Sequence, residues 1–113
     1  MDSILTSVKK QLGIAEDYEH FDPDIIIHIN SVFSILNQLG VGPPEGFSIS
    51  DETSVWTDFI GDSLKLELVK TYVYLKIRLI FDPPTSSAVM DAFKQNIAEL
   101  EWRISVTVDP PTT

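Results

Sequence analysis

Residues 22–40, DPDIIIHINSVFSILNQLG, decide the fold class of this chain. Asp22-Pro23-Asp24 supplies an N-cap carboxylate, a proline at the first helical position and a second acid in the first turn. Apolar residues then recur at steps of three and four until Gly40 ends the pattern. These residues are Ile25, Ile26, Ile29, Phe33, Leu36 and Leu39. The stretch therefore predicts an amphipathic helix that buries one face.

A shorter helical pattern precedes this stretch, over residues 3–12. Ile4, Leu5, Val8 and Leu12 fall on one face, and Gly13 is a natural residue just past a helix end. A helix this short is marginal in water, so we expect it to dock on a larger element.

Residues 64–81 alternate in places like a half-buried strand, but eighteen residues without a turn signal exceed an ordinary strand. We therefore predict a helix that begins at a cap on Asp62 or Ser63 and stops at Asp82-Pro83-Pro84. It carries two apolar stripes: Leu64, Leu68, Tyr72, Leu75 and Leu79 on one face, and Leu66, Val69, Val73, Ile77 and Ile80 on another. Such a helix is central in a bundle, or is shared between a core and a subunit interface.

The last helical pattern covers about residues 86–105. Its single stripe, which faces a partner, is Val89, Phe93, Ile97, Leu100 and Ile104. Val106-Thr107-Val108 then has strand-like propensity, and the following Asp109-Pro110-Pro111 cannot be helical. We predict an all-α domain over residues 1–105, a small bundle of about four helices, followed by an extended C-terminal tail over residues 106–113.

An irregular loop joins the second and third predicted helices, between residues 41 and 61. Five large apolar residues lie in it among Ser, Asp, Thr and Gly: Phe47, Ile49, Val55, Trp56 and Phe59. We expect a loop with one short strand or helical turn. Because it is so apolar, it either folds back on the bundle or contacts a neighbour.

The net charge of −9 is unevenly distributed. Residues 1–62 carry eleven acids and two bases, whereas residues 63–113 carry six of each. A chain without a basic stripe lacks the electrostatic footprint of a nucleic-acid reader, and a neutral or acidic recognition helix argues against a helix-turn-helix protein.

Composition also argues against several other classes of function. There is no cysteine, which removes disulfides, thiol nucleophiles and thiolate metal sites. No span of 18 apolar residues occurs, so we expect no membrane helix, and the N-terminus does not have the pattern of a signal peptide.

Tests for catalytic and metal-binding patterns give no candidate, so we expect no enzyme, no cofactor and no metal. The chain has neither a nucleophile elbow nor a phosphate-binding glycine pattern. Residues 16–24 contain five acids and His20. With His20 or His28, this cluster is the alternative that could bind the metal of a divalent-ion-dependent enzyme. We interpret this cluster as a solvated loop whose last acids complement the next helix dipole.

The stretch Phe81-Asp82-Pro83-Pro84-Thr85-Ser86-Ser87-Ala88-Val89-Met90, continuing to Ile97-Ala98-Glu99-Leu100-Glu101-Trp102-Arg103, resembles the head–tail connector (adaptor, or head-completion) family of tailed phages and prophages. Other parts that fit are Leu12-Gly13-Ile14, Trp56 with Phe59-Ile60, and the helix from Leu68 to Lys76. The resemblance covers about residues 3–105.

This resemblance implies an all-helical structural subunit of the virion neck, assembled in the host cytoplasm. Such subunits form a homo-oligomeric ring, commonly twelve-fold, that docks on the portal protein and presents a platform for the next neck or tail-completion protein. DNA passes through the ring without specific binding, and an acidic surface suits that passage because it repels DNA. The alternative is an acidic helical regulatory module, such as an inhibitor that mimics DNA.

Six apolar residues are our candidates for an assembly interface: Phe47, Ile49, Trp56, Trp102, Val106 and Val108. Trp56 can belong either to the core or to an interface. Trp102 lies beside the main stripe of the last helix, where a core position is the default and an interface anchor is the alternative.

Overall fold

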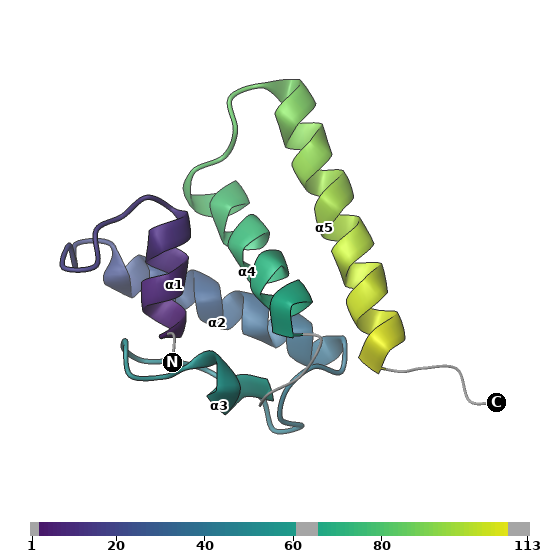
Figure 1. Ribbon diagram of the computed structural model, residues 1–113, viewed down its shortest axis with the longest axis horizontal. Helices are drawn as coiled ribbons and strands as arrows, with labels where there is room; N and C mark the ends of the chain where they lie inside the picture. The colour runs from purple at the N-terminus through teal and green to yellow at the C-terminus, as the bar shows by residue number, and fades with distance from the viewer. Residues whose placement is uncertain (1–2, 61–65, 109–113) are drawn as a thin grey trace.

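The computed structural model describes residues 3–60 and 66–108 (Figure 1). These ranges contain five helices and one isolated β-bridge, between Ser3 and Val55. The helices are α1 (Ile4–Gln11), α2 (Asp22–Gln38), α3 (Trp56–Ile60), α4 (Leu66–Phe81) and α5 (Ser87–Val108). The molecule measures 49 × 36 × 20 Å. Its thickness equals about two helix diameters, and the predicted all-α class is confirmed.

Local signals explain where α1 begins and ends. The Ser3 side chain accepts a hydrogen bond from the Thr6 amide at 3.3 Å and so caps the helix. Gly13 follows the C-cap with φ of 77°, a conformation that glycine adopts without strain. The predicted ends of this helix are therefore confirmed.

The start of α2 differs from the prediction in one respect. The helix begins at Asp22 itself, and Phe21 occupies the N-cap position without a side-chain cap. The Asp22 carboxylate instead forms an ion pair with Lys9 Nζ at 2.9 Å. The prediction of a capping carboxylate was wrong because a tertiary ion pair takes this side chain.

Helix α4 is the central element of the bundle, as its two apolar stripes predict. It contacts α1, α2 and α5, and α1 and α4 lie across α2 while α5 runs beside α4 (Figure 1). Its fully buried residues are Val69, Tyr72, Val73 and Ile77. Ile80, at the end of one stripe, is 53% exposed. The predicted caps at Asp62 and Ser63, and Leu64, lie outside the described residues.

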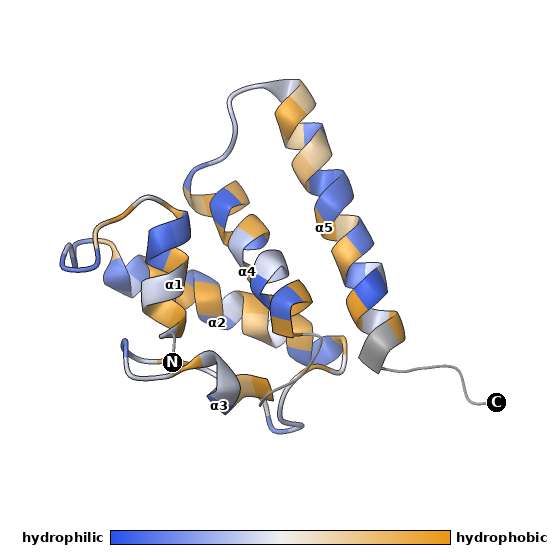
Figure 2. Ribbon diagram, viewed as in Figure 1, coloured by the Kyte–Doolittle hydropathy of each residue, from blue (hydrophilic) through white to orange (hydrophobic). Residues whose placement is uncertain are grey.

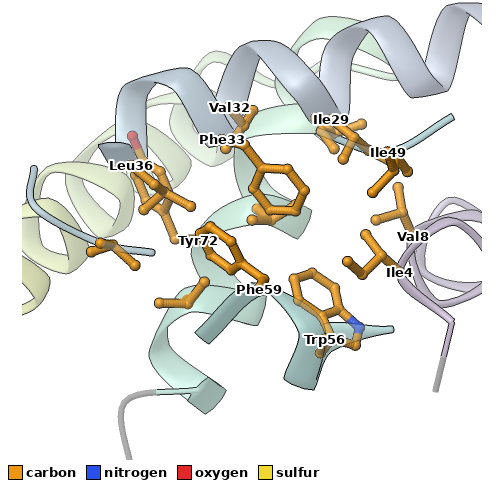
Figure 3. Close-up of a cluster of buried hydrophobic side chains, with 14 of the residues drawn as sticks. Ile4, Val8, Ile29, Val32, Phe33, Leu36, Ile49, Trp56, Phe59 and Tyr72 are labelled. Atoms are coloured by element: carbon orange, nitrogen blue, oxygen red, sulfur yellow. The ribbon is translucent and has the colours of Figure 1, made fainter. Parts of the chain in front are cut away.

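The loop between α2 and α4 contributes buried side chains to the core. It includes α3, whose Asp58 carboxylate accepts a hydrogen bond from the Val55 amide at 3.0 Å, as in a capping box. Figure 3 shows Trp56 and Phe59 of α3 pointing toward Phe33 of α2 and Tyr72 of α4. Phe33 and Phe59 stack with ring centroids 4.5 Å apart. Of the predicted alternatives, a short strand or a helical turn, the helical turn is present, and the loop folds back on the bundle.

Helix α5 extends further than the sequence predicts. It runs to Val108, so the predicted end at about residue 105 is three residues too early. Strand-like propensity at residues 106–108 does not end the helix, because no breaker occurs before Pro110 and Ile104 anchors the preceding turn in the core. Residues 109–113, the rest of the predicted tail, lie outside the described residues.

Candidate assembly surfaces

Helix α5 is attached to the bundle along one face. Ile97 and Ile104 are buried on that face, whereas Val89, near the start of the helix, is 44% exposed. The predicted stripe therefore enters the core only in the C-terminal part of the helix. A polar contact reinforces the attachment, since the Tyr72 hydroxyl of α4 donates a hydrogen bond to Glu101 Oε2 at 2.7 Å.

Tyr72 remains a hydrogen-bond donor over the physiological pH range. Burial raises the pKa of the Tyr72 phenol well above its ordinary value, and the hydrogen bond to Glu101 and its negative charge add to the shift. The contact between α4 and α5 is therefore a charge-assisted hydrogen bond, which is stronger than a neutral one.

The opposite face of α5 carries an apolar stripe without a partner within the described chain. Ala98, Trp102 and Val106 recur every four residues on the face turned away from α4. Trp102 is 67% exposed and Val106 is 40% exposed. The default expectation of a core position for Trp102 was wrong. We call these three residues the outer stripe of α5.

Three of the predicted interface residues instead pack within the subunit. Ile49 and Trp56 are 4% and 3% exposed. Phe47 is half-buried and packs edge-on against Phe33, with centroids 5.4 Å apart. Their apolar surface is used by the subunit's own core, so the expectation that they present an assembly surface is revised. Val108 lies in the last turn of α5, and its side chain lies outside the described residues.

Asn30 of α2 holds the α2–α3 loop in place. Its amide nitrogen donates to the Ile49 carbonyl at 3.0 Å, and its Oδ1 accepts from the Ile49 amide at 2.8 Å. Trp56 is fixed in the same way, because its Nε1 donates to Ser7 Oγ of α1 at 3.2 Å. Side chains 19 and 49 residues away in sequence therefore decide where the loop lies.

The α1–α2 loop is held by a buried lysine. Lys9 is 2% exposed; its Nζ donates to the Glu16 carbonyl at 2.8 Å and pairs with Asp22. Among the described residues no hydrogen bond reaches Asp22 Oδ1, which is buried, so the Lys9 charge compensates it. Burying a lysine is costly, and here the buried Lys9 ties Glu16 in the loop and Asp22 at its end to α1.

Aromatic contacts hold the middle of the same loop. Tyr18 and Phe21 meet edge-on at 5.8 Å, and Phe21 meets Phe81, the last residue of α4, at 5.2 Å. Tyr18 is 49% exposed, and Ile27, one turn into α2, is 61% exposed. Four exposed carboxylates surround them: Glu16, Asp17, Glu19 and Asp24. We call residues 16–27 the acidic end; its outer bend is hydrophilic (Figure 2).

The acids and histidines of the described residues form no metal site. No group of three or more His, Asp or Glu within residues 3–60 and 66–108 could hold a metal ion. His20 packs edge-on against Phe21, with centroids 4.9 Å apart. A groove of about 600 Å³ between α1 and α4 is lined mainly by hydroxyl groups and the lysines Lys10 and Lys70, with no histidine. Among the described helices, none is long and apolar enough to cross a membrane.

The exposure of Ile27 and Tyr18 and the burial of Lys9 were not predicted, although the sequence around Ile27 and Lys9 carries a signal. Ile27 ends the run Ile25-Ile26-Ile27, yet it lies on the polar face of α2 with Asp24 and Ser31. Lys9 falls at helical spacing between Leu5 and Leu12, within the apolar face of α1. A residue of the wrong polarity on a helix face indicates either a buried ion pair or an exposed contact surface.

These features define a small helical protein in which buried polar and aromatic contacts hold helices that carry exposed apolar side chains. Over residues 4–111 the chain matches the family model described as phage connector protein, and it belongs to that family. The family is structural, and it places the chain in the virion neck, in contact with portal or tail proteins. No curated protein and no solved structure gave a significant match.

Proposed function

We propose that this chain is a ring-forming subunit of the phage neck. The ring docks on the portal protein, prolongs the DNA channel and receives the next neck or tail-completion protein, and it is assembled in the host cytoplasm. The observation that carries the proposal is the outer stripe of α5. In a member of a connector family, an exposed tryptophan on a helix that is anchored on its other side is typical of an interface anchor.

The acidic loops support the passage of DNA. Glu45, Asp51, Glu52 and Asp58 are exposed on the α2–α3 loop and α3. Repeated around a ring, such carboxylates repel the phosphates of a translocating duplex and keep it mobile. The alternative, an inhibitor that mimics DNA, would require carboxylates ordered at phosphate spacing on one surface, whereas these lie on several loops.

The test is a mass determination in solution, with and without the portal protein. We expect the chain to co-migrate with portal as a multimeric complex and to leave duplex DNA unbound at physiological salt. Trp102→Ala should weaken the complex, whereas Val89→Ala, which removes another exposed apolar side chain from the same helix, is the matched control. A chain that stays monomeric beside portal, or that binds DNA tightly at physiological salt, would contradict the proposal.

A further inference from the structure

Two exposed apolar surfaces lie at opposite ends of the molecule. The acidic end, with Tyr18 and Ile27, occupies one end of the longest dimension, and α5, with Trp102 and Val106, occupies the other (Figure 1). The two surfaces differ in sequence and in charge. Contacts between unlike surfaces of identical chains are head-to-tail, and they close into rings when the rotation between neighbours permits.

The acidic end is ordered in advance of any contact. The Lys9 ion pair holds its base, and the contacts of Phe21 with Tyr18 and Phe81 hold its middle. A loop that served only as a solvated connection would have no need of a buried lysine. Preorganisation lowers the entropy cost of association, which makes this loop a suitable contact surface despite its charge.

Charge decides which surface meets which. Residues 3–60 hold nine acids and two bases, whereas residues 66–108 hold five of each. Two acidic ends brought together would repel each other. The three side chains of the outer stripe are uncharged. Beside them, the half-exposed Arg103 guanidinium pairs with Glu99 at 2.9 Å and can also face a neighbour's carboxylate.

We propose that the outer stripe of α5 in one subunit packs on the acidic end of the next copy. Trp102 and Val106 cover Tyr18 and Ile27 of the neighbour, and the neighbour's carboxylates face Arg103. This inference rests on the proposed ring and names the two surfaces that build it. A second copy is the occupant because the same chain supplies both an acidic surface with exposed apolar side chains and an uncharged stripe that accepts it.

Cross-linking tests this contact directly, because the chain has no cysteine of its own. Ala98→Cys places a thiol one turn from Trp102, and Ser31→Cys places one a turn from Ile27; both positions are exposed. The two variants are mixed and treated with a flexible bismaleimide, which also traps transient encounters. We expect the mixture to give a cross-linked heterodimer far in excess of the homodimer formed by either variant alone.

Two controls make the result specific. Ser48→Cys is an exposed serine variant on the α2–α3 loop, and mixed with Ala98→Cys it should give only background cross-linking. Trp102→Ala introduced beside Ala98→Cys should lower the heterodimer yield about tenfold, as expected for an interface anchor. Circular dichroism checks that each variant is folded.

The proposal is overturned if Ala98→Cys alone cross-links as well as the mixture, which indicates a symmetric α5 contact. It is also overturned if the mixture gives no more product than the Ser48→Cys control. Neither result affects the mass determination with portal. The experiments therefore distinguish a wrong contact from a wrong function. A multimer on portal without this cross-link would leave the ring function standing and remove only the contact proposed here.

Discussion

At the scale of the residue, Lys9 stands out because its charged side chain is buried. Its Nζ lies within 2.9 Å of Asp22 Oδ1 and its side chain is 3% exposed, whereas that of Asp22 is 21% exposed. The pair connects α1 to the first residue of α2. Removing one member of a buried pair leaves the other charge uncompensated, which costs more than the pair contributes.

We therefore predict that Lys9→Met lowers the free energy of unfolding by about 2 kcal/mol, because the Asp22 carboxylate loses its counter-charge. Urea denaturation measures this change. Adding Asp22→Asn to the Lys9→Met variant should recover about 1 kcal/mol, since the unpaired charge is then absent. A double variant no more stable than Lys9→Met would show that the pair is not coupled. Lys10→Met, at an exposed neighbouring position, should stay within about 0.5 kcal/mol of the wild type.

Asn30 gives a second prediction at this scale. Asn30→Ala removes both hydrogen bonds to the backbone of Ile49, a residue whose side chain is buried. The substitution should lower the free energy of unfolding by about 2 kcal/mol. Differential scanning calorimetry or urea denaturation measures the loss. Ser31→Ala, one residue further and exposed, is the control. Equal stability of the two variants would mean that Asn30 does not hold the loop.

At the scale of the element, the attachment of α5 depends on a few contacts. Only part of its apolar stripe is buried, so the hydrogen bond from Tyr72 to Glu101 carries a larger share of its positioning than it would in a fully packed helix. We predict that Tyr72→Phe destabilises the protein by about 1–2 kcal/mol. Hydrogen exchange should also become faster at the amides of α5.

The matched control is Tyr18→Phe, because the described residues offer the Tyr18 hydroxyl no hydrogen bond. Unchanged exchange in α5 after Tyr72→Phe would show that apolar packing alone positions the helix. The raised pKa of Tyr72 gives the same contact a signature in pH. Its protonated form is favoured in the fold, so this contribution to stability is full below about pH 10, the ordinary value for tyrosine. It declines as the pH rises further, and Tyr72→Phe should remove that part of the decline.

At the scale of the whole molecule, folding and assembly use different residues. Ile104 closes the core, whereas Val106, one half-turn later, belongs to the outer stripe. We predict that deleting residues 106–113 leaves the unfolding transition nearly unchanged but weakens the multimer with portal. Deleting residues 109–113 alone keeps the outer stripe and is the control. Full assembly after the longer deletion would exclude a role for Val106 and for the residues beyond it.

The sequence by itself determined the helices. Proline and glycine signals such as those at Gly13 and Pro83 act on the backbone within a few residues, so they are readable without the fold. The two apolar stripes of α4 predicted a helix that is either central or shared with a subunit interface, and in the subunit it is central. The end of α5 was placed too early, because β-branched residues at 106–108 have only a weak local preference and a well-anchored helix overrides it.

Only the tertiary structure decided which apolar side chains are exposed. The two tryptophans are an example. The sequence favours a core position for Trp102 and leaves core and interface open for Trp56, yet Trp56 is buried and Trp102 is exposed. The fate of Trp56 depends on Ser7, which is 49 residues away, and that of Trp102 on which side of α5 faces α4. Neither relation is a local property. Spacing along a helix reports that a face is apolar, but the partner that covers this face is chosen by the packing of distant elements.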